Sequence, residues 1–556
     1  MQNKTSQTIS RIHITNQFQS VSKVRFGRPF HVVSSSPRDL YTIYELAAPL
    51  GPGEKLDINF NVGYTSRGFK DGNERPELAY SGTFFDSNYF PTIGYDNSIE
   101  LDDPRRRREE HLPEQELLPR RGDPVGTVTN LFTPNSDWIT YHTTVSTSDS
   151  DSEGQPQIAI SPGYLTREWH ENGRHYFSYD MGDIKTLDFY AFISARYDVK
   201  REVYQGAVNP VAIEVYHITA HAYDVDDMIA ASKAGLAYYE KNFSPFQFRQ
   251  YRILEFPRYR TFAQSFPNTV PFSEGIGFIG RLEKPTDIDF TYFVTAHELG
   301  HQWWAHQLIG GRVEGSNMLS ETLAEYSALM VMKKKYGSDN MHRFLKHELD
   351  QYLRGRAGEI RKERSVVLVQ NEPYVRYQKG GQVMYTLADY IGEDKLNLAL
   401  HNFLMQYRYA NANDSQSGPY PDTRQFVDAV RAQTPPELQY YITDSFESIV
   451  LYDNKALTAT VTQRPDKRYK VTLTVQSRKV RSDGSGNETR SSQGARRPLR
   501  LLCQPASLPV LINGVAGGHG VFVPLYDQRP ALRRPEDGRG GAEEWNARRR
   551  GGSEPN

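Results

Sequence analysis

The spacing of hydrophobic and polar positions differs between two parts of the chain. From Arg11 to about Thr219, short alternating or β-branched runs are separated by clusters of Pro, Gly, Asn and Asp, a pattern typical of strands joined by loops. From about His221 onward, apolar residues recur every three or four positions, which predicts helices. The helices expected from this spacing are 224–242, 289–308, 317–336, 340–354, 380–391 and 395–407.

The C-terminal part of the chain returns to strand-like alternation and then loses all periodicity. Segments 456–463 and 469–477 alternate cleanly on either side of a turn, which predicts a β-hairpin. The last 67 residues, 490–556, contain eleven Arg, no Lys and ten Gly, with neither a strand period nor a helix period. We therefore expect a partial β domain over 451–489, followed by a disordered or out-of-frame tail over 490–556.

Composition and charge narrow the class of protein. A chain of 556 residues is too long for one hydrophobic core, so about two to four domains are expected. With 66 basic and 67 acidic residues, the net charge of -1 argues against a nucleic-acid partner. The single cysteine, Cys503, excludes an intrachain disulfide and a Cys-rich metal site. No apolar run has the length of a transmembrane helix, and the first twenty residues lack a signal peptide's apolar stretch, so neither anchor nor signal is expected.

The segment from His297 to His301 has the pattern H-E-x-x-H within an apolar helical context. Histidines four positions apart lie on one face of a helix, so both imidazoles can bind the same zinc ion. Glu298, next to the first histidine, can reach a water on the metal and act as general base. The same pattern can also arise by chance on a core helix, so further ligands are needed to support a metal site.

A catalytic zinc takes three protein ligands and leaves one position open for water. Glu321 is the natural third ligand, because it begins the next expected helix after the Gly-rich turn 310–315. Glu325 lies one turn further along the same face. Its carboxylate can accept the free N–H of a liganding histidine and so fix the tautomer. A solvated helix carboxylate is the equally simple interpretation of Glu325.

With these residues in place, the sequence resembles a known family. The segments HELGHQWWAHQ and LSETLAEYSALM resemble the zinc aminopeptidases of the aminopeptidase N family (peptidase family M-one, gluzincins). The resemblance runs from about Asp39 to Thr489 and is closest to the peptidase part of bacterial permease-fused members. In the family, eighteen residues separate the second histidine from the ligand glutamate, whereas nineteen do so here. We expect the extra residue in the 310–315 turn and keep Glu321 as the ligand.

The resemblance implies two further sets of site residues. The family's exopeptidase motif, G-x-M-E-N, has a counterpart in PFSEG, followed by Ile-Gly-Phe, in which only Glu274 and the later Gly277 match. A carboxylate there would pair with the α-ammonium of a peptide, although a plain loop carboxylate is the alternative for Glu274. The run that begins at Tyr377, YQKGG, resembles the family segment whose phenol donates a hydrogen bond to the oxyanion of the tetrahedral intermediate. Without the resemblance, Tyr377 would be interpreted as an aromatic residue at the start of a helix with a role in packing.

The remaining histidines are expected to be structural. His306 lies five residues after the second candidate ligand and off its helical face, which favours a packing or surface role. His217 and His221 form a second pair four residues apart, but they lie near a strand–helix junction without an evident acidic third ligand.

Together these features predict a multidomain α+β protein. It would have an N-terminal β domain (1–219), a thermolysin-like zinc peptidase domain (220–450) and a small partial C-terminal β domain. The expected activity is removal of N-terminal residues from peptides with a free N-terminus, by attack of a water activated by one zinc ion. The alternatives are a zinc endopeptidase, or a weakly active peptidase-like module associated with a membrane transporter. The resemblance implies a membrane-associated setting in bacteria, from which this chain would lack the upstream membrane part.

Overall fold

The computed structural model divides the chain into two compact units, one of 1–452 with 479–492 and one of 453–478 with 493–556. Within these limits the structure describes residues 1–16, 20–65, 77–79, 81–94, 100–113, 115, 117–136, 138–148, 156–282, 284, 287–359, 361–409, 419–463, 465–466, 469–490 and 510–511.

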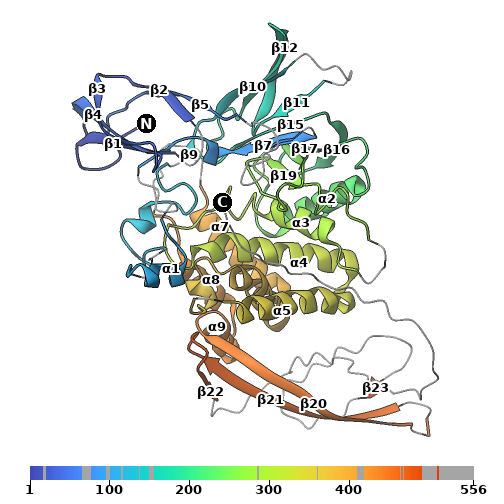
Figure 1. Ribbon diagram of the computed structural model, residues 1–556. Helices are drawn as coiled ribbons and strands as arrows, with labels where there is room; N and C mark the ends of the chain where they lie inside the picture. The colour runs from blue at the N-terminus through green and yellow to red at the C-terminus, as the bar shows by residue number, and fades with distance from the viewer. Residues whose placement is uncertain are drawn as a thin grey trace, which may run out of the picture. The chain divides into compact units, whose positions relative to one another are not determined.

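The first half of the larger unit is built from β-sheets (Figure 1). Two of these sheets are four-stranded, with the strand orders β3-β4-β1-β8 and β11-β15-β7-β6. A three-stranded sheet, β10-β13-β12, and two strand pairs, β2-β5 and β14-β9, complete this part. The strands are β1 (Ile9–Thr15), β2 (Ser20–Phe26), β3 (Phe30–Ser36), β4 (Tyr41–Leu50), β5 (Ile58–Gly63), β6 (Leu78–Ala79), β7 (Gly82–Asp86), β8 (Thr92–Ile93), β9 (Trp138–Ile139), β10 (His142–Ser148), β11 (Ile158–Ile160), β12 (Tyr164–Glu171), β13 (Arg174–Asp180), β14 (Thr186–Leu187) and β15 (Ala191–Ala195).

A mixed sheet joins this β-rich part to the helical part. Its order is β16-β17-β18-β19, formed by β16 (Asp198–Gln205), β17 (Pro210–His217), β18 (Gln250–Phe256) and β19 (Thr269–Ser273). The first pair is antiparallel and the other two are parallel, and α2 forms the crossover between β17 and β18. The helices are α1 (Pro104–Glu109), α2 (Val225–Asn242), α3 (Phe290–Gly300), α4 (Leu323–Tyr336), α5 (Met341–Ala357), α6 (Gly380–Ile391), α7 (Glu393–Tyr407), α8 (Thr423–Gln433) and α9 (Gln439–Ser445).

Short helical turns connect these elements. Two of them are π-helical, η4 (Met318–Thr322) and η7 (Val375–Lys379), and each runs directly into an α-helix. The 3-10 turns are η1 (Ser87–Tyr89), η3 (Gly126–Val128), η5 (Ser338–Asn340), η6 (Val366–Leu368) and η8 (Pro436–Leu438).

Most helices expected from the apolar spacing are confirmed, but the one expected over 289–308 is wrong at its C-terminal end. Helix α3 stops at Gly300, and the following residues form irregular turns. In these turns the N–H of His306 reaches the carbonyl of His301, a five-residue spacing that an α-helix does not use. The apolar spacing persists because Trp303 and Trp304 are fully buried in the core, so periodicity alone could not show where the helix ends.

The antiparallel pair α3 and α4 is fixed at both ends. At one end, the buried Asp289 carboxylate caps α3 by accepting from the N–H of Tyr292 at 3.1 Å. The same carboxylate accepts hydrogen bonds from Lys335 and Tyr336 at the C-terminal end of α4. At the other end, Gly300 packs on Ala324, where an added Cβ would lie 3.3 Å from the Ala324 backbone. The C-terminal turn of α3 therefore faces the N-terminal turn of α4.

The smaller unit contains the hairpin predicted for 456–477. Strand β20 (Ile449–Gln463) precedes β21 (Tyr469–Ser482), and the parts of both strands within 453–478 belong to this unit. Strand β23 (Val510–Leu511) pairs in parallel with Tyr469 and Lys470. The last part of β21 belongs to the larger unit and pairs with β22 (Glu488–Arg490). The tail predicted over 490–556 otherwise lies outside the described residues.

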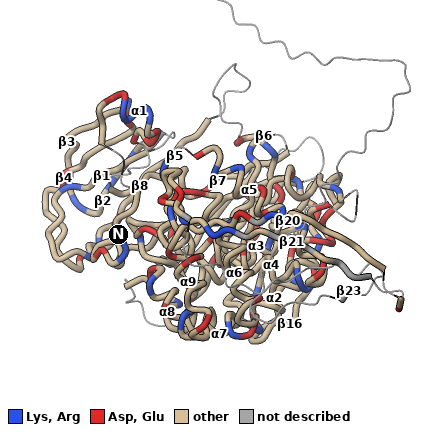
Figure 2. Tube along the Cα trace, turned by 90° about the horizontal axis from the view of Figure 1, so that it is seen from below, with Lys and Arg blue, Asp and Glu red and all other residues tan. Residues whose placement is uncertain are grey.

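The described helices include none that is long and apolar enough to cross a lipid bilayer. Figure 2 shows acidic and basic residues interspersed along the described trace.

Candidate functional site

The residues of the H-E-x-x-H motif lie at the C-terminal end of α3. His297 and Glu298 belong to the last turn of the helix, and His301 follows as its C-terminal cap with still-helical dihedral angles. All three residues are buried, with 7% of His297, 7% of Glu298 and 9% of His301 exposed. Although the helix is shorter than predicted, this geometry keeps the two histidines one turn apart and on one face, as the sequence indicated.

His297, His301 and Glu321 converge on one point. The two Nε2 atoms are 3.1 Å apart, and the Oε2 atom of Glu321 lies 3.5 Å from the first and 3.3 Å from the second. Ligands about 2.0–2.1 Å from a tetrahedral zinc ion are themselves about 3.3–3.4 Å apart. The three atoms therefore already form one face of a tetrahedron of the size that zinc requires, and the fourth corner is left for water or substrate.

The second ring nitrogen of each histidine is held by a neighbour. Nδ1 of His297 lies 3.0 Å from Oε2 of Glu325, and Nδ1 of His301 lies 3.2 Å from Oγ of Ser320. The Glu325 carboxylate can only accept, which favours the His297 tautomer whose Nε2 is free to bind a metal, and the Ser320 hydroxyl can accept from Nδ1 of His301 in the same way. Glu325 is 3% exposed, which rules out a solvated surface carboxylate.

Electrostatics favour a cation at this point. Burial opposes ionisation of Glu321, but the two histidines lower the pKa of its carboxyl well below the usual range. Burial alone would lower the pKa of His297, whereas Glu321 and Glu325 raise it well above the usual value. The negative charge concentrated around His297 is what a divalent cation would neutralise.

Glu298 lies beside the three candidate zinc ligands and can accept a further hydrogen bond. Its carboxylate is buried, and its Oε2 atom has no hydrogen-bond partner among the described residues. Burial raises the pKa of Glu298, while the charges of His301 and His297 act in the opposite direction. A buried carboxylate with a raised pKa and an unused oxygen is suited to accept and release a proton.

The Tyr377 ring lies against that of His297, with centroids 5.8 Å apart. Burial raises the pKa of Tyr377, and the negative charge of Glu321 raises it further, so the phenol keeps its proton. Two glycines that follow explain how this side chain comes so close. A Cβ on Gly380 would lie 2.3 Å from Oγ1 of Thr322, and one on Gly381 would lie 2.6 Å from Cγ of Glu325. Only glycine lets the start of α6 approach η4 and α4 so closely.

Glu274 and Gly277 contact residues other than the candidate zinc ligands. The Glu274 carboxylate accepts the N–H of Arg258 at 3.1 Å and lies 3.8 Å from Nδ1 of His221. Gly277 packs against the buried side chains of Phe272 and Met228. The atoms of Glu274 are not part of the group formed by the three candidate zinc ligands.

No acidic partner of His221 was evident in the sequence, yet the fold brings two carboxyl groups to it. Its Nδ1 atom pairs with the buried Glu255 of β18, and Glu274 completes the group. Burial raises the pKa of Glu255 to about 7, and the hydrogen bond from His221 acts against this increase. His217 instead bonds the backbone oxygen of Ile218, a contact typical of a structural histidine, whereas His221 lies in a group of ionisable side chains that the sequence did not indicate.

Glu348 was missed by the sequence analysis. It lies on α5, is 5% exposed and contacts the carboxyl of Glu325, and burial raises its pKa to about 9. The neutral acid can therefore donate a hydrogen bond to Glu325. No sequence pattern could have identified it, because the contact depends on how α5 packs beside α4.

Comparisons with known proteins find similarity to peptidases. Residues 229–417 match the profile of the Peptidase family M1 domain. The chain is 26% identical over 124 residues to putative aminopeptidase-2 of Caenorhabditis elegans, which covers 22% of this chain and 6% of that protein. It is 22% identical over 195 residues to probable aminopeptidase 1 of Sulfurisphaera tokodaii, and this match covers 34% of this chain and 25% of that protein. The matches thus span a quarter or less of the length of these relatives.

Solved structures share the fold. An M1 zinc metallopeptidase from Deinococcus radiodurans aligns with a TM-score of 0.50 and 16% identity, over 78% of this chain and 85% of that one. Legionella pneumophila aminopeptidase A, in complex with aspartic acid, aligns with a TM-score of 0.52 and 15% identity, over 87% of this chain and 53% of that one. The predicted multidomain fold, with a β-rich N-terminal part followed by a helical domain, is confirmed.

Proposed function

We propose that this chain is a zinc-dependent aminopeptidase whose catalytic domain occupies residues 220–450. The observation that carries the proposal is the tetrahedral spacing of His297, His301 and Glu321, with the buried Glu298 beside them. All four residues lie inside the segment that matches the Peptidase family M1 domain. This combination of ligands, two histidines and one glutamate, is typical of catalytic zinc.

The residues of the site divide the work of peptide hydrolysis. Zinc, when bound, polarises the scissile carbonyl and lowers the pKa of a coordinated water. Glu298 accepts the proton of the attacking water and delivers it to the leaving amine. The Tyr377 phenol, which keeps its proton, donates a hydrogen bond to the oxygen on which negative charge develops. Glu325 and Ser320 hold the two histidines in orientation throughout.

Glu274 is our candidate for binding the free amine of the substrate. Its side chain is 14% exposed, so a ligand can reach it. Glu255 lies in the same group, and because its pKa is raised to about 7, it adds a second negative charge, and so a stronger attraction for an ammonium, as the pH rises above neutral. His221 competes for both carboxylates, and a substrate amine would have to share them with this imidazole.

Blocking the substrate amine tests this part of the proposal. We expect an N-acetylated peptide to be cleaved at least about 30-fold more slowly than the free peptide, because a lost ammonium–carboxylate contact costs about 2 kcal/mol or more. Amidation of the C-terminus serves as the control and should change the rate little. Equal cleavage of blocked and free peptides would instead support the zinc endopeptidase.

Removing the third ligand tests the zinc site itself. We expect Glu321→Ala to weaken zinc binding by more than about 100-fold, since replacing even a residue that only supports a ligand costs about 10–100-fold. Competition with a chromogenic chelator measures the affinity. The matched control is Glu437→Ala, which removes an exposed carboxylate in η8. Unchanged zinc affinity in Glu321→Ala would transfer the ligand role to another residue.

The closer resemblance to permease-fused bacterial members rests on sequence segments alone. We propose on that basis that the natural partner of this domain is a membrane transporter part. A weakly active module is the corresponding alternative function, and the rate of peptide hydrolysis distinguishes it from an efficient peptidase.

A further inference from the structure

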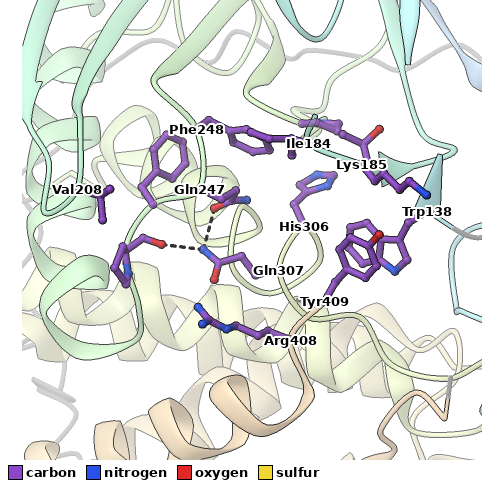
Figure 3. Close-up of a pocket in the computed structure, with 14 residues that line it drawn as sticks. Trp138, Ile184, Lys185, Val208, Gln247, Phe248, His306, Gln307, Arg408 and Tyr409 are labelled. Carbon is purple, nitrogen blue, oxygen red and sulfur yellow. Dashed lines mark hydrogen bonds between the residues drawn. The ribbon is translucent and has the colours of Figure 1, made fainter. Parts of the chain in front are cut away.

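A pocket of about 420 Å³ lies within the larger unit, between strands of the β-rich part and turns of the helical part (Figure 3). Trp138 of β9 and the segment before β14 form one wall. The rest of the lining comes from the loop between α2 and β18, from the turn after α3 and from the two residues that follow α7. None of the candidate zinc ligands lines it.

The charged residues that line this pocket are both cations. Lys185 and Arg408 contribute side chains, and no Asp or Glu is among the described lining residues. Arg408 follows the last residue of α7, and its guanidinium forms no ion pair or hydrogen bond with any residue that the structure describes. A half-buried cation without a counter-ion attracts an anion more strongly than a solvated surface arginine does.

The rest of the lining includes four large aromatic side chains together with aliphatic and polar residues. Phe246 and Phe248 face the pocket, and Trp138 stacks on Tyr409 with ring centroids 4.2 Å apart and planes at 8°. Such walls suit the apolar body of a small molecule. The amide of Gln307 is held by the framework, because its Nε2 atom donates to Pro245 and Gln247 and its Oε1 atom accepts from Ser244.

His306 is held by the framework, because its Nε2 atom donates to the carbonyl of Ser265 at 2.9 Å. Among the described lining residues, Lys185 and Arg408 therefore carry the positive charge that a ligand would meet.

We propose that this pocket binds a small organic anion, an aryl or alkyl carboxylate, with the carboxylate at Arg408 and the apolar body against Phe246 and Phe248. A zwitterionic amino acid is disfavoured, because the described lining offers no carboxylate for its ammonium. The site is separate from the proposed peptidase chemistry and does not depend on it.

Calorimetric titration of the full-length, zinc-loaded protein with 3-phenylpropionate tests the proposal, with leucine hydroxamate present to occupy the zinc. We expect 3-phenylpropionate to bind at least about tenfold more tightly than its neutral amide or phenylalanine, since hydrogen bonds to charged groups contribute about that much. Arg408→Gln should weaken binding of the carboxylate at least about tenfold and remove its advantage over the amide. Lys346→Gln, which removes a positive charge on α5 away from the pocket lining, should have no effect.

A second variant avoids any effect on packing. Val208 lies at the pocket and is 66% exposed, so substitutions there should not disturb the fold. Val208→Glu should weaken binding of 3-phenylpropionate by charge repulsion, whereas Val208→Gln should not. Equal binding of the acid and its amide, unchanged affinity in both Arg408→Gln and Val208→Glu, or no binding of the acid at millimolar concentration would overturn the proposal.

Discussion

Replacing Glu298 with glutamine is expected to lower kcat for peptide hydrolysis by about a thousandfold while zinc stays bound. Proton transfer by a positioned carboxylate contributes about 10²–10⁴ in rate, and glutamine cannot accept the proton. Zinc should remain because Glu298 is not one of the three atoms that converge at zinc spacing. Glutamine has nearly the same shape, so the buried site should keep its packing.

Two measurements on the Glu298→Gln protein separate the role of base from that of ligand. Metal analysis should give one zinc per chain, and steady-state kinetics should show the loss in kcat. Glu437→Gln, at an exposed position, should behave as the parent protein in both. Loss of zinc would make Glu298 a ligand, and more than a few per cent of residual kcat would remove it from the mechanism.

Replacing Tyr377 with phenylalanine is expected to lower kcat by about 100-fold and to change KM little. Removing one hydrogen-bond donor to a developing oxyanion costs about 10²–10³ in kcat, because the interaction forms only in the transition state. The phenol keeps its proton because burial and Glu321 raise its pKa, so the loss should be similar across the working pH range.

Tyr374→Phe is the matched control for this variant. Its phenol lies three residues earlier and donates a hydrogen bond to Glu359, away from the candidate zinc ligands. We expect about the parent kcat from Tyr374→Phe and a small loss of stability, about 1 kcal/mol, from the missing hydrogen bond. Equal effects of the two substitutions on kcat would mean that Tyr377 has only a packing role.

Local patterns predicted much of the framework that carries the site. The helix expected over 380–391 matches α6, and the glycines at the ends of α4 and α6, Gly337 and Gly392, have the positive φ angles that such ends favour. The relation of His297 to His301 was also predictable, because it depends only on helical spacing. Glu321 required one further step, the fold-back of the next helix, which a Gly-rich turn indicates.

Features that depend on packing could not be predicted. Glu321 and Tyr377 both lie in π-helical turns, and nothing in the apolar spacing distinguishes these turns from α-helix. The contact between Glu348 and Glu325 depends on the packing of α5 beside α4. The pairing of His221 with Glu255 likewise joins residues that are 34 positions apart in the sequence.

Titrating zinc into the metal-stripped protein while recording hydrolysis of an aminoacyl p-nitroanilide tests the central claim most directly. The account predicts no hydrolysis without zinc and a linear rise with added zinc. The rise should end at one equivalent per chain, because the three ligand atoms define a single tetrahedral site. A rate that stays at the metal-free level at every zinc concentration, although zinc binds, would contradict the assignment of this chain as a zinc aminopeptidase.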